Sequence, residues 1–232
     1  PTQIGSYIFD EDYGEDPFLE DHGTLWLIHW LIASNSSMTT TIAWFFSKYH
    51  KRNFDQNELR AALSNYLQDE VFKRPVLSTI KNDVSVLTRL YAKKQSSIIS
   101  EDSLDSPMSE LGLIGEHGKN AYISLFDEQQ SLPSEIVGLA ICQLMSKRTS
   151  SIVPLAELMQ SQENYVSVGS TFRLNESGFI VKLEYLARNF PQYFDLRETA
   201  GLRQLFVDPA TNRMELLYAY YGKASSYTEY AV

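Results

Sequence analysis

The stretch Leu25–Ile32 is apolar at nearly every position, and it constrains the fold more than any other part of the chain. A helix that is apolar on all sides has to be buried by other segments of the protein. The stretch is far shorter than the roughly 20 residues needed to cross a bilayer. We therefore predict a buried helix that begins near Thr24 and is capped by Asp21.

Three more helical patterns follow before residue 100. The first repeats apolar side chains with i, i+3, i+4, i+7 spacing between Ile42 and Tyr49. Asp55 and Glu58 have the spacing of a capping box and predict the start of the second. The third follows Pro75, a residue that suits the first turn of a helix. Its predicted inner face consists of Leu77, Ile80, Val84, Leu87 and Tyr91.

Two short apolar segments, Leu111–Ile114 and Ala121–Phe126, flank a turn-forming sequence and predict a β-hairpin. Three helices followed by a hairpin are typical of a winged helix. The same order of elements recurs after residue 127, with a second hairpin at 194–207. The predicted fold class is therefore mainly α with small β-hairpins, arranged as tandem winged-helix, or helix-turn-helix-like, modules. We expect an acidic lead-in (1–23), a first module (24–126), a second module (127–208) and a C-terminal helix and tail (209–232).

Charge is distributed very unevenly along the chain. The net charge of -9 argues against a protein that binds nucleic acid through its whole surface. Residues 1–21 contain seven acids and no base, whereas residues 71–95 contain six bases and one acid. The sequence therefore predicts an acidic head and a body with one basic stripe.

The basic stripe coincides with the helix that would enter DNA. In helix-turn-helix proteins the later helix reads the major groove with its N-terminal residues. Hydroxyl and ammonium groups suit phosphate, and the Asn amide suits adenine edges. A solvated charged face is the alternative interpretation, and in the nearly neutral second module protein contact is as plausible as DNA contact. The candidate DNA-binding residues are Lys73, Arg74, Ser78, Thr79, Lys81, Asn82, Arg89 and, in the second module, Lys182.

Two acidic clusters are candidates for chemistry, one in the lead-in and one around residues 101–110. Carboxylates a few residues apart can hold Mg²⁺, which activates water and stabilises the leaving oxygen in a nuclease. The candidate catalytic residues are Asp16, Glu20, Asp102 and Asp105, and the candidate metal ligands are Asp16, Glu20 and Asp105. The alternative for the first cluster is a solvated segment in which Asp21 caps a helix.

Other reactive residues and motifs point away from a metabolic enzyme. His29 lies within the apolar helix and is predicted to be a core histidine, and Cys142 is predicted to be a buried apolar residue. The chain has no phosphate loop, dinucleotide fingerprint, zinc-type Cys/His set or nucleophile elbow. A single cysteine and no signal peptide predict a cytoplasmic protein without a membrane segment.

Several longer motifs resemble the SspB-like family of bacterial DNA phosphorothioation proteins. These motifs cover most of residues 8–126, and the second half of the chain matches more loosely. Relatives carry an upstream N-terminal segment, so this chain looks like the part that follows it. The matching motifs are Gly14–Asp21, Thr24–Trp30, Trp44–Phe46, Ser78–Val84, Glu101–Pro107 and Glu110–Ile114.

The resemblance implies a role in placing sulfur in the DNA backbone as an anti-phage defence mark, with DNA nicking as the activity. It implies a cysteine desulfurase, an ATP-pyrophosphatase-like sulfur-transfer enzyme and an ATPase as partners. One hypothesis is therefore a magnesium-dependent DNA nicking endonuclease. The other is a non-catalytic tandem winged-helix adaptor that docks the sulfur-transfer enzymes on DNA.

Overall fold

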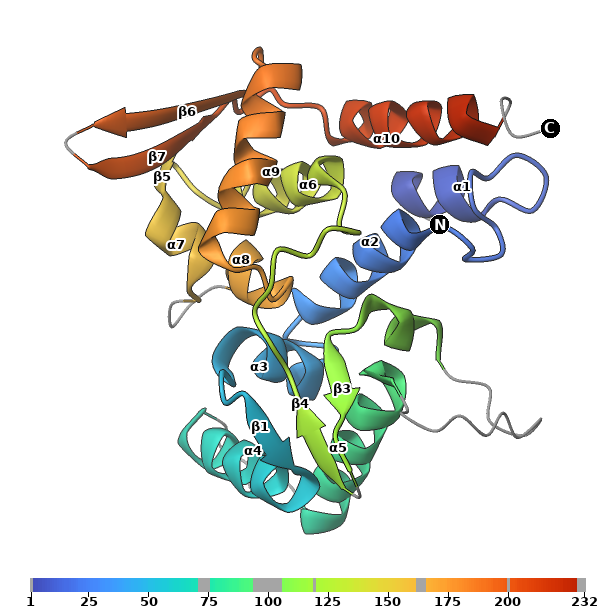
Figure 1. Ribbon diagram of the computed structural model, residues 1–232, viewed down its shortest axis with the longest axis vertical. Coiled ribbons are helices and arrows are strands. Elements are labelled where there is room, and N and C mark those ends of the chain that lie inside the picture. The colour runs from blue at the N-terminus through green and yellow to red at the C-terminus, as the bar shows by residue number, and fades with distance from the viewer. Residues whose placement is uncertain are drawn as a thin grey trace. The chain divides into compact units, whose positions relative to one another are not determined.

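The computed structural model describes residues 2–70, 76–93, 106–118, 120–161, 166–199 and 201–228. It divides the chain into two compact units. Unit 1 combines Pro1–Trp30 with Asp127–Val232, and unit 2 is Leu31–Phe126. Both are mainly helical with small sheets, which confirms this part of the predicted fold class (Figure 1). None of the described helices is long and apolar enough to cross a membrane.

Unit 2 places a four-stranded sheet beside three helices. The strand order is β1-β4-β3-β2, and β3 and β4 form an antiparallel hairpin where one was predicted. Its first strand is Ile114–Glu116 rather than Leu111–Ile114, because the chain up to Leu111 forms a 3-10 helix. Asp55 accepts hydrogen bonds from the backbone N–H groups of Asn57 (2.6 Å) and Glu58 (2.9 Å), so the predicted cap is confirmed. The elements are α3 (Thr40–Lys48), β1 (Asn53–Asp55), α4 (Gln56–Glu70), α5 (Leu77–Tyr91), β2 (Ala92–Lys93), the 3-10 helix η1 (Pro107–Leu111), β3 (Ile114–Glu116) and β4 (Ala121–Ile123).

Unit 1 has a three-stranded antiparallel sheet with the order β5-β7-β6, and β6 and β7 form the long hairpin seen in Figure 1. Asn175 caps α9 by accepting a hydrogen bond from the N–H of Gly178 at 2.8 Å. The elements are α1 (Gln3–Phe9), α2 (His22–Ala33), α6 (Ser134–Met145), β5 (Ile152–Pro154), α7 (Leu155–Met159), α8 (Val168–Thr171), α9 (Glu176–Asn189), β6 (Phe194–Thr199), β7 (Leu202–Val207) and α10 (Arg213–Thr228).

One order of elements occurs in both units: a helix, a strand, further helices and a hairpin. The second strand of each hairpin also pairs antiparallel with the earlier strand, as β4 does with β1 and β7 does with β5. The two halves of the chain therefore repeat a strand topology as well as an element order.

Helix α2 is buried as predicted, but in unit 1 rather than in the module that follows it in sequence. The indole N–H of Trp26 donates to Ser131 Oγ (3.2 Å), and that of Trp30 donates to Gln143 Oε1 (3.0 Å). Both indole rings contact Phe172. These partners all come from residues after 127. The compact units accordingly divide after Trp30, and segments after residue 127 cover the apolar helix.

His29 is the polar exception in this helix. Its ring is fully buried, and its Nε2 lies 2.8 Å from the carbonyl oxygen of Thr171. Burial is the main reason that the pKa of His29 falls from the ordinary 6.5 to about 4; the contact with Thr171 opposes this shift and the nearby Arg173 charge adds to it. The imidazole is therefore neutral at pH 7, which agrees with the predicted core histidine.

Lowering the pH is expected to destabilise the fold through His29. Because its folded pKa is below its unfolded value, the unfolded chain takes up a proton first as the pH falls below about 6.5. The stability contributed by the neutral ring is lost progressively until about pH 4. A His29→Gln variant keeps a donor for Thr171 but does not titrate. Its free energy of unfolding should depend less on pH in this window, by up to about 1.4 kcal/mol per pH unit. Equal slopes in urea unfolding of both proteins would contradict the assignment.

Gly178→Ala is expected to lower the free energy of unfolding by about 1–3 kcal/mol, because the new methyl group would collide with backbone. A Cβ at Gly178 would lie 2.5 Å from Cα and 2.7 Å from the carbonyl oxygen of Glu128. The matched control is Gly222→Ala in α10, where no atom lies within 4 Å. This control should be neutral or stabilising by up to about 1 kcal/mol, since Ala favours helix. Thermal unfolding that shifts equally in both variants would show that the close approach is unimportant.

Candidate nucleic-acid interface

Helix α5 carries the candidate DNA-contact residues on one exposed face. Its inner face consists of buried Ile80, Val84, Leu87 and Tyr91, which fixes the rotation of the helix about its axis. The structure therefore brings the polar candidates together on the opposite, solvent-exposed side. These residues are Ser78, Thr79, Lys81, Asn82 and Arg89.

Polar contacts with neighbouring elements hold α5 in place. Thr41 of α3 donates a hydrogen bond to the carboxylate of Asp83 at 3.1 Å. Gln56 of α4 donates to Thr88 at 3.0 Å and to the hydroxyl of Tyr122 in β4 at 3.3 Å. Asp83 is the one acid in the α5 sequence, and Thr41 engages its carboxylate. The charged side chains at the exposed positions of α5 are therefore both cations, Lys81 and Arg89.

The N-terminus of α5 adds partial positive charge to that of the exposed cations. Val76 occupies the N-cap position and provides no side-chain hydrogen bond to the first turn. Uncapped amides at a helix N-terminus attract anions such as phosphate. The candidates Lys73 and Arg74, which precede this end, lie outside the described residues.

Leu77 departs from the predicted arrangement. The apolar spacing placed it on the inner face of α5, but its side chain is 77% exposed. It is the first residue of the helix, one turn before the packed position Ile80. Val76, which precedes it, is also exposed, and so is Val86, more than two turns further along α5. The exposed side of α5 therefore includes apolar side chains that periodicity did not predict.

Lys182 lies inside unit 1 rather than on an exposed face of α9. It lies on the inner side of α9 with only 7% of its surface exposed, and its ammonium group donates to the carbonyl oxygen of Leu132 at 2.6 Å. Burial lowers its pKa to about 8, against the opposing effect of Glu135 and Glu128. We therefore remove Lys182 from the candidate DNA-binding residues, because its aliphatic stem packs inward and its charge is used inside unit 1.

Asp16 likewise has a structural position rather than the expected catalytic or metal-binding one. It is 5% exposed, and its two carboxylate oxygens accept the backbone N–H groups of Glu20 (2.8 Å) and Asp21 (3.1 Å). Asp21 in turn caps α2 by accepting the N–H of Thr24 at 3.0 Å, as predicted. These bonds fold the acidic segment against the start of α2, so we no longer assign Asp16 to metal or catalysis.

The remaining acidic candidates are not assembled into a site by the described residues. Glu20 is exposed, whereas Asp102 and Asp105 lie outside the described ranges. Within those ranges no group of three or more His, Cys, Asp or Glu side chains could hold a metal ion. Mg²⁺ takes several oxygen ligands in octahedral geometry, and within the described residues the acids of the lead-in do not by themselves assemble such a set.

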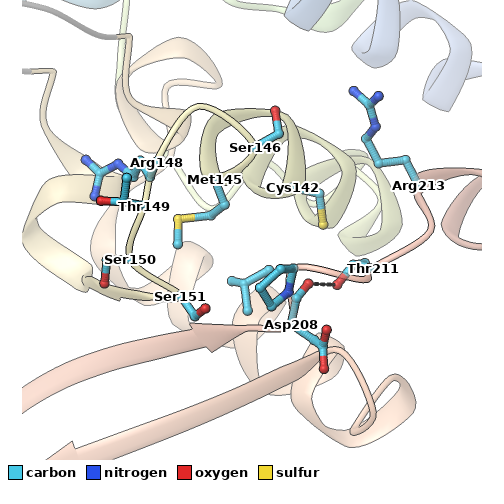
Figure 2. A pocket seen from close by; sticks show the side chains of 12 residues that line it. Cys142, Met145, Ser146, Arg148, Thr149, Ser150, Ser151, Asp208, Thr211 and Arg213 are labelled. Atoms are coloured by element: carbon cyan, nitrogen blue, oxygen red, sulfur yellow. Dashed lines mark hydrogen bonds between the residues drawn. The ribbon is translucent and has the colours of Figure 1, made fainter.

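A polar pocket of about 450 Å³ in unit 1 lies between the end of α6 and the segment that connects β7 to α10 (Figure 2). Cys142 and Met145 point into it from α6, and Thr211 donates to the carbonyl oxygen of Asp208 beside it. Burial raises the pKa of the Cys142 thiol to about 12. The thiol is therefore protonated at pH 7 and unsuited to act as a nucleophile. None of the candidate DNA-binding or catalytic residues lines this pocket.

Comparison with solved structures shows strong similarity to SspB. A structure described as magnesium ion-bound SspB has a TM-score of 0.82 and 27% sequence identity, and it covers 96% of this chain. A second SspB crystal structure gives a TM-score of 0.81 with 28% identity and the same coverage. The chain spans 66% of the length of each of these relatives. No curated protein matches the sequence.

A family model also matches the sequence over residues 1–221, which is nearly its whole length. The match includes both units and therefore the α5 face as well as the acidic segment. The chain thus belongs to the family described as protein of unknown function (DUF4007), and it is an SspB-like member of that family.

Proposed function

We propose that both units are winged-helix-type modules and that unit 2 binds DNA through α5. The repeated strand topology supports the first part of this proposal. The observation that carries the second is the separation of faces on α5: Ile80, Val84 and Leu87 are buried while Lys81 and Arg89 are exposed. In this arrangement the first turns of α5 would enter the major groove and the flanking cations would contact phosphates.

The SspB-like fold supports a place for this protein in DNA phosphorothioation. We propose that it is the DNA-binding component of such an anti-phage defence system in the bacterial cytoplasm. Its proposed partners are the cysteine desulfurase, the ATP-pyrophosphatase-like sulfur-transfer enzyme and the ATPase of the system. DNA bound on α5 would then be presented to the enzymes that insert sulfur.

DNA nicking is the activity we propose for the chain. Support comes from the similarity to an SspB structure described as magnesium ion-bound and from the acidic residues of the matched motifs. With Asp16 removed, Glu20, Asp102 and Asp105 remain as candidate catalytic residues, and Glu20 and Asp105 remain as candidate metal ligands.

A non-catalytic adaptor is the second candidate function, and the surface of α9 favours it. In unit 1, α9 occupies the place in the element order that α5 has in unit 2. Its exposed side chains include an apolar one, Val181, together with Glu176 and Glu184. Acids repel DNA, whereas an apolar side chain with a charged border suits contact with protein. In this second function unit 2 would hold DNA and α9 would dock a protein.

Lys81→Glu is expected to weaken binding to duplex DNA and to reduce the dependence of affinity on salt. Each lost phosphate contact lowers the slope of log K against log salt by about 0.9 for duplex DNA. Fluorescence anisotropy with a labelled duplex between 50 and 300 mM NaCl would measure both quantities. The matched control is Lys147→Glu, which makes the same charge change at an exposed position of unit 1. Equal weakening by both variants would show that only net charge matters and would contradict a specific α5 interface.

Nicking of supercoiled plasmid by the purified chain is expected with Mg²⁺ and not with EDTA. Asp105→Asn should abolish nicking while leaving duplex binding unchanged, because it removes a candidate ligand but no cation of α5. Asp16→Asn is the matched carboxylate control, which should nick and have lower thermal stability. Absence of nicking in the wild-type chain, together with α5-dependent DNA binding, would favour the adaptor. Full nicking by Asp105→Asn would remove this residue from the mechanism.

A further inference from the structure

The loop between α1 and α2 holds two large aromatic side chains in solvent. Tyr13 is 89% exposed and Phe18 is 81% exposed, whereas most aromatic side chains of the described fold are buried or half-buried. Exposed aromatic groups of this size often mark protein contact sites, because burying them against a partner releases much apolar surface from water. Neither ring is buried by the described residues of unit 1, so packing among them does not explain these two side chains.

The same loop is held in a defined conformation by backbone contacts. The carboxylate of Asp10 accepts the N–H groups of Asp12 (3.1 Å) and Tyr13 (3.0 Å). The backbone N–H of Gly14 donates to the carbonyl oxygen of Asp10 at 2.9 Å. Together with the two bonds to Asp16, these contacts fix both ends of the loop. Aromatic side chains presented by a pre-formed loop lose little conformational entropy on binding.

The charge around Tyr13 and Phe18 restricts the partner. Exposed acids flank both residues in the sequence, and residues 1–21 contain no base. DNA would be repelled by this segment, so the partner must have a basic border around apolar groups. The exposed acids of the loop are Asp10, Glu11, Asp12, Glu15 and Glu20.

A surface with these properties is present on the same protein. The exposed face of α5 combines Lys81 and Arg89 with the exposed apolar side chains of Leu77 and Val86. Aromatic groups with an acidic border on one surface thus match aliphatic groups with a basic border on the other. Charge complementarity of this kind guides association and fixes its register.

We propose that the acidic aromatic loop of one copy docks on the α5 face of a second copy and competes there with DNA. This inference rests on the proposed function in one respect, namely that α5 is the surface DNA occupies. Self-association would then keep α5 covered until DNA displaces the loop. Because the contact pairs two charged surfaces, it weakens as salt shortens the range of electrostatic attraction.

The test is sedimentation velocity of the full chain at several concentrations in 50 mM and 500 mM NaCl. The wild-type protein should associate as concentration rises at low salt and dissociate at high salt or with an excess of a short DNA duplex. The double variant Tyr13→Ser/Phe18→Ser should have an association constant lower by about tenfold or more, since buried aromatic groups dominate interfaces. The control Leu202→Ser removes an exposed apolar group from the β6–β7 hairpin and should associate as wild type.

Mixing two variants gives the decisive result. The loop variant Tyr13→Ser/Phe18→Ser keeps its α5 face, and the helix variant Lys81→Glu/Arg89→Glu keeps its loop. Each alone should remain monomeric, whereas an equimolar mixture should form a one-to-one complex. A wild-type chain that stays monomeric at all concentrations, or a mixture that does not associate, would overturn the proposal.

Duplex binding of the dilute loop variant tests DNA contact separately. If the loop variant binds duplex DNA as tightly as the wild-type chain does, and no protein or mixture self-associates, this inference is rejected and the proposed function remains intact.

Discussion

The burial of α2 is the constraint on which unit 1 depends. A helix that is apolar nearly all round must be enclosed, and α2 is enclosed by segments that lie a hundred residues later in the chain. The Trp26 and Trp30 indoles supply both the apolar area and the directional contacts, because each N–H donates to a specific side chain, Ser131 or Gln143. His29 adds a contact with the backbone that requires a neutral ring. These directional bonds join the N-terminal helix to the C-terminal half, and unit 2 is inserted between them in sequence.

The sequence predicted those parts of the fold whose causes are local. Periodicity identified the inner face of α5, and the spacing of Asp55 and Glu58 identified the start of α4. Which unit encloses α2 could not be predicted, since an apolar helix carries no information about its partner. The short helix α1 was missed because its seven residues fall in a segment whose acids suggested a solvated lead-in.

The unexpected positions of two candidate site residues share one physical origin: residue type indicates what a side chain can bind but not where it points. Lys182 is of a residue type that often contacts DNA, yet its long aliphatic stem allows the ammonium group to reach the carbonyl oxygen of Leu132 inside unit 1. Asp16 is of a residue type that often binds metal ions, yet backbone N–H groups donate hydrogen bonds to both of its carboxylate oxygens. Ser78, Thr79, Lys81 and Asn82 were placed correctly on the exposed face, because the apolar positions of α5 fix the direction of its other side chains.

A protein with net charge -9 can bind DNA only if its negative charge is kept away from the DNA-binding surface. Here residues 1–21 contain seven acids and no base, and several of these acids accept hydrogen bonds from the backbone or from tyrosine. Tyr220, for example, donates to the Asp21 carboxylate at 2.8 Å. The cations of α5 remain exposed, and its one acid is engaged by Thr41. This separation produces two surfaces of opposite charge on one chain, and each is held by the packing of its own unit. The acidic segment has a fixed shape and carries charge of the same sign as DNA. A ligand that binds the basic surface of α5 is therefore expected to be affected by the acidic segment as well.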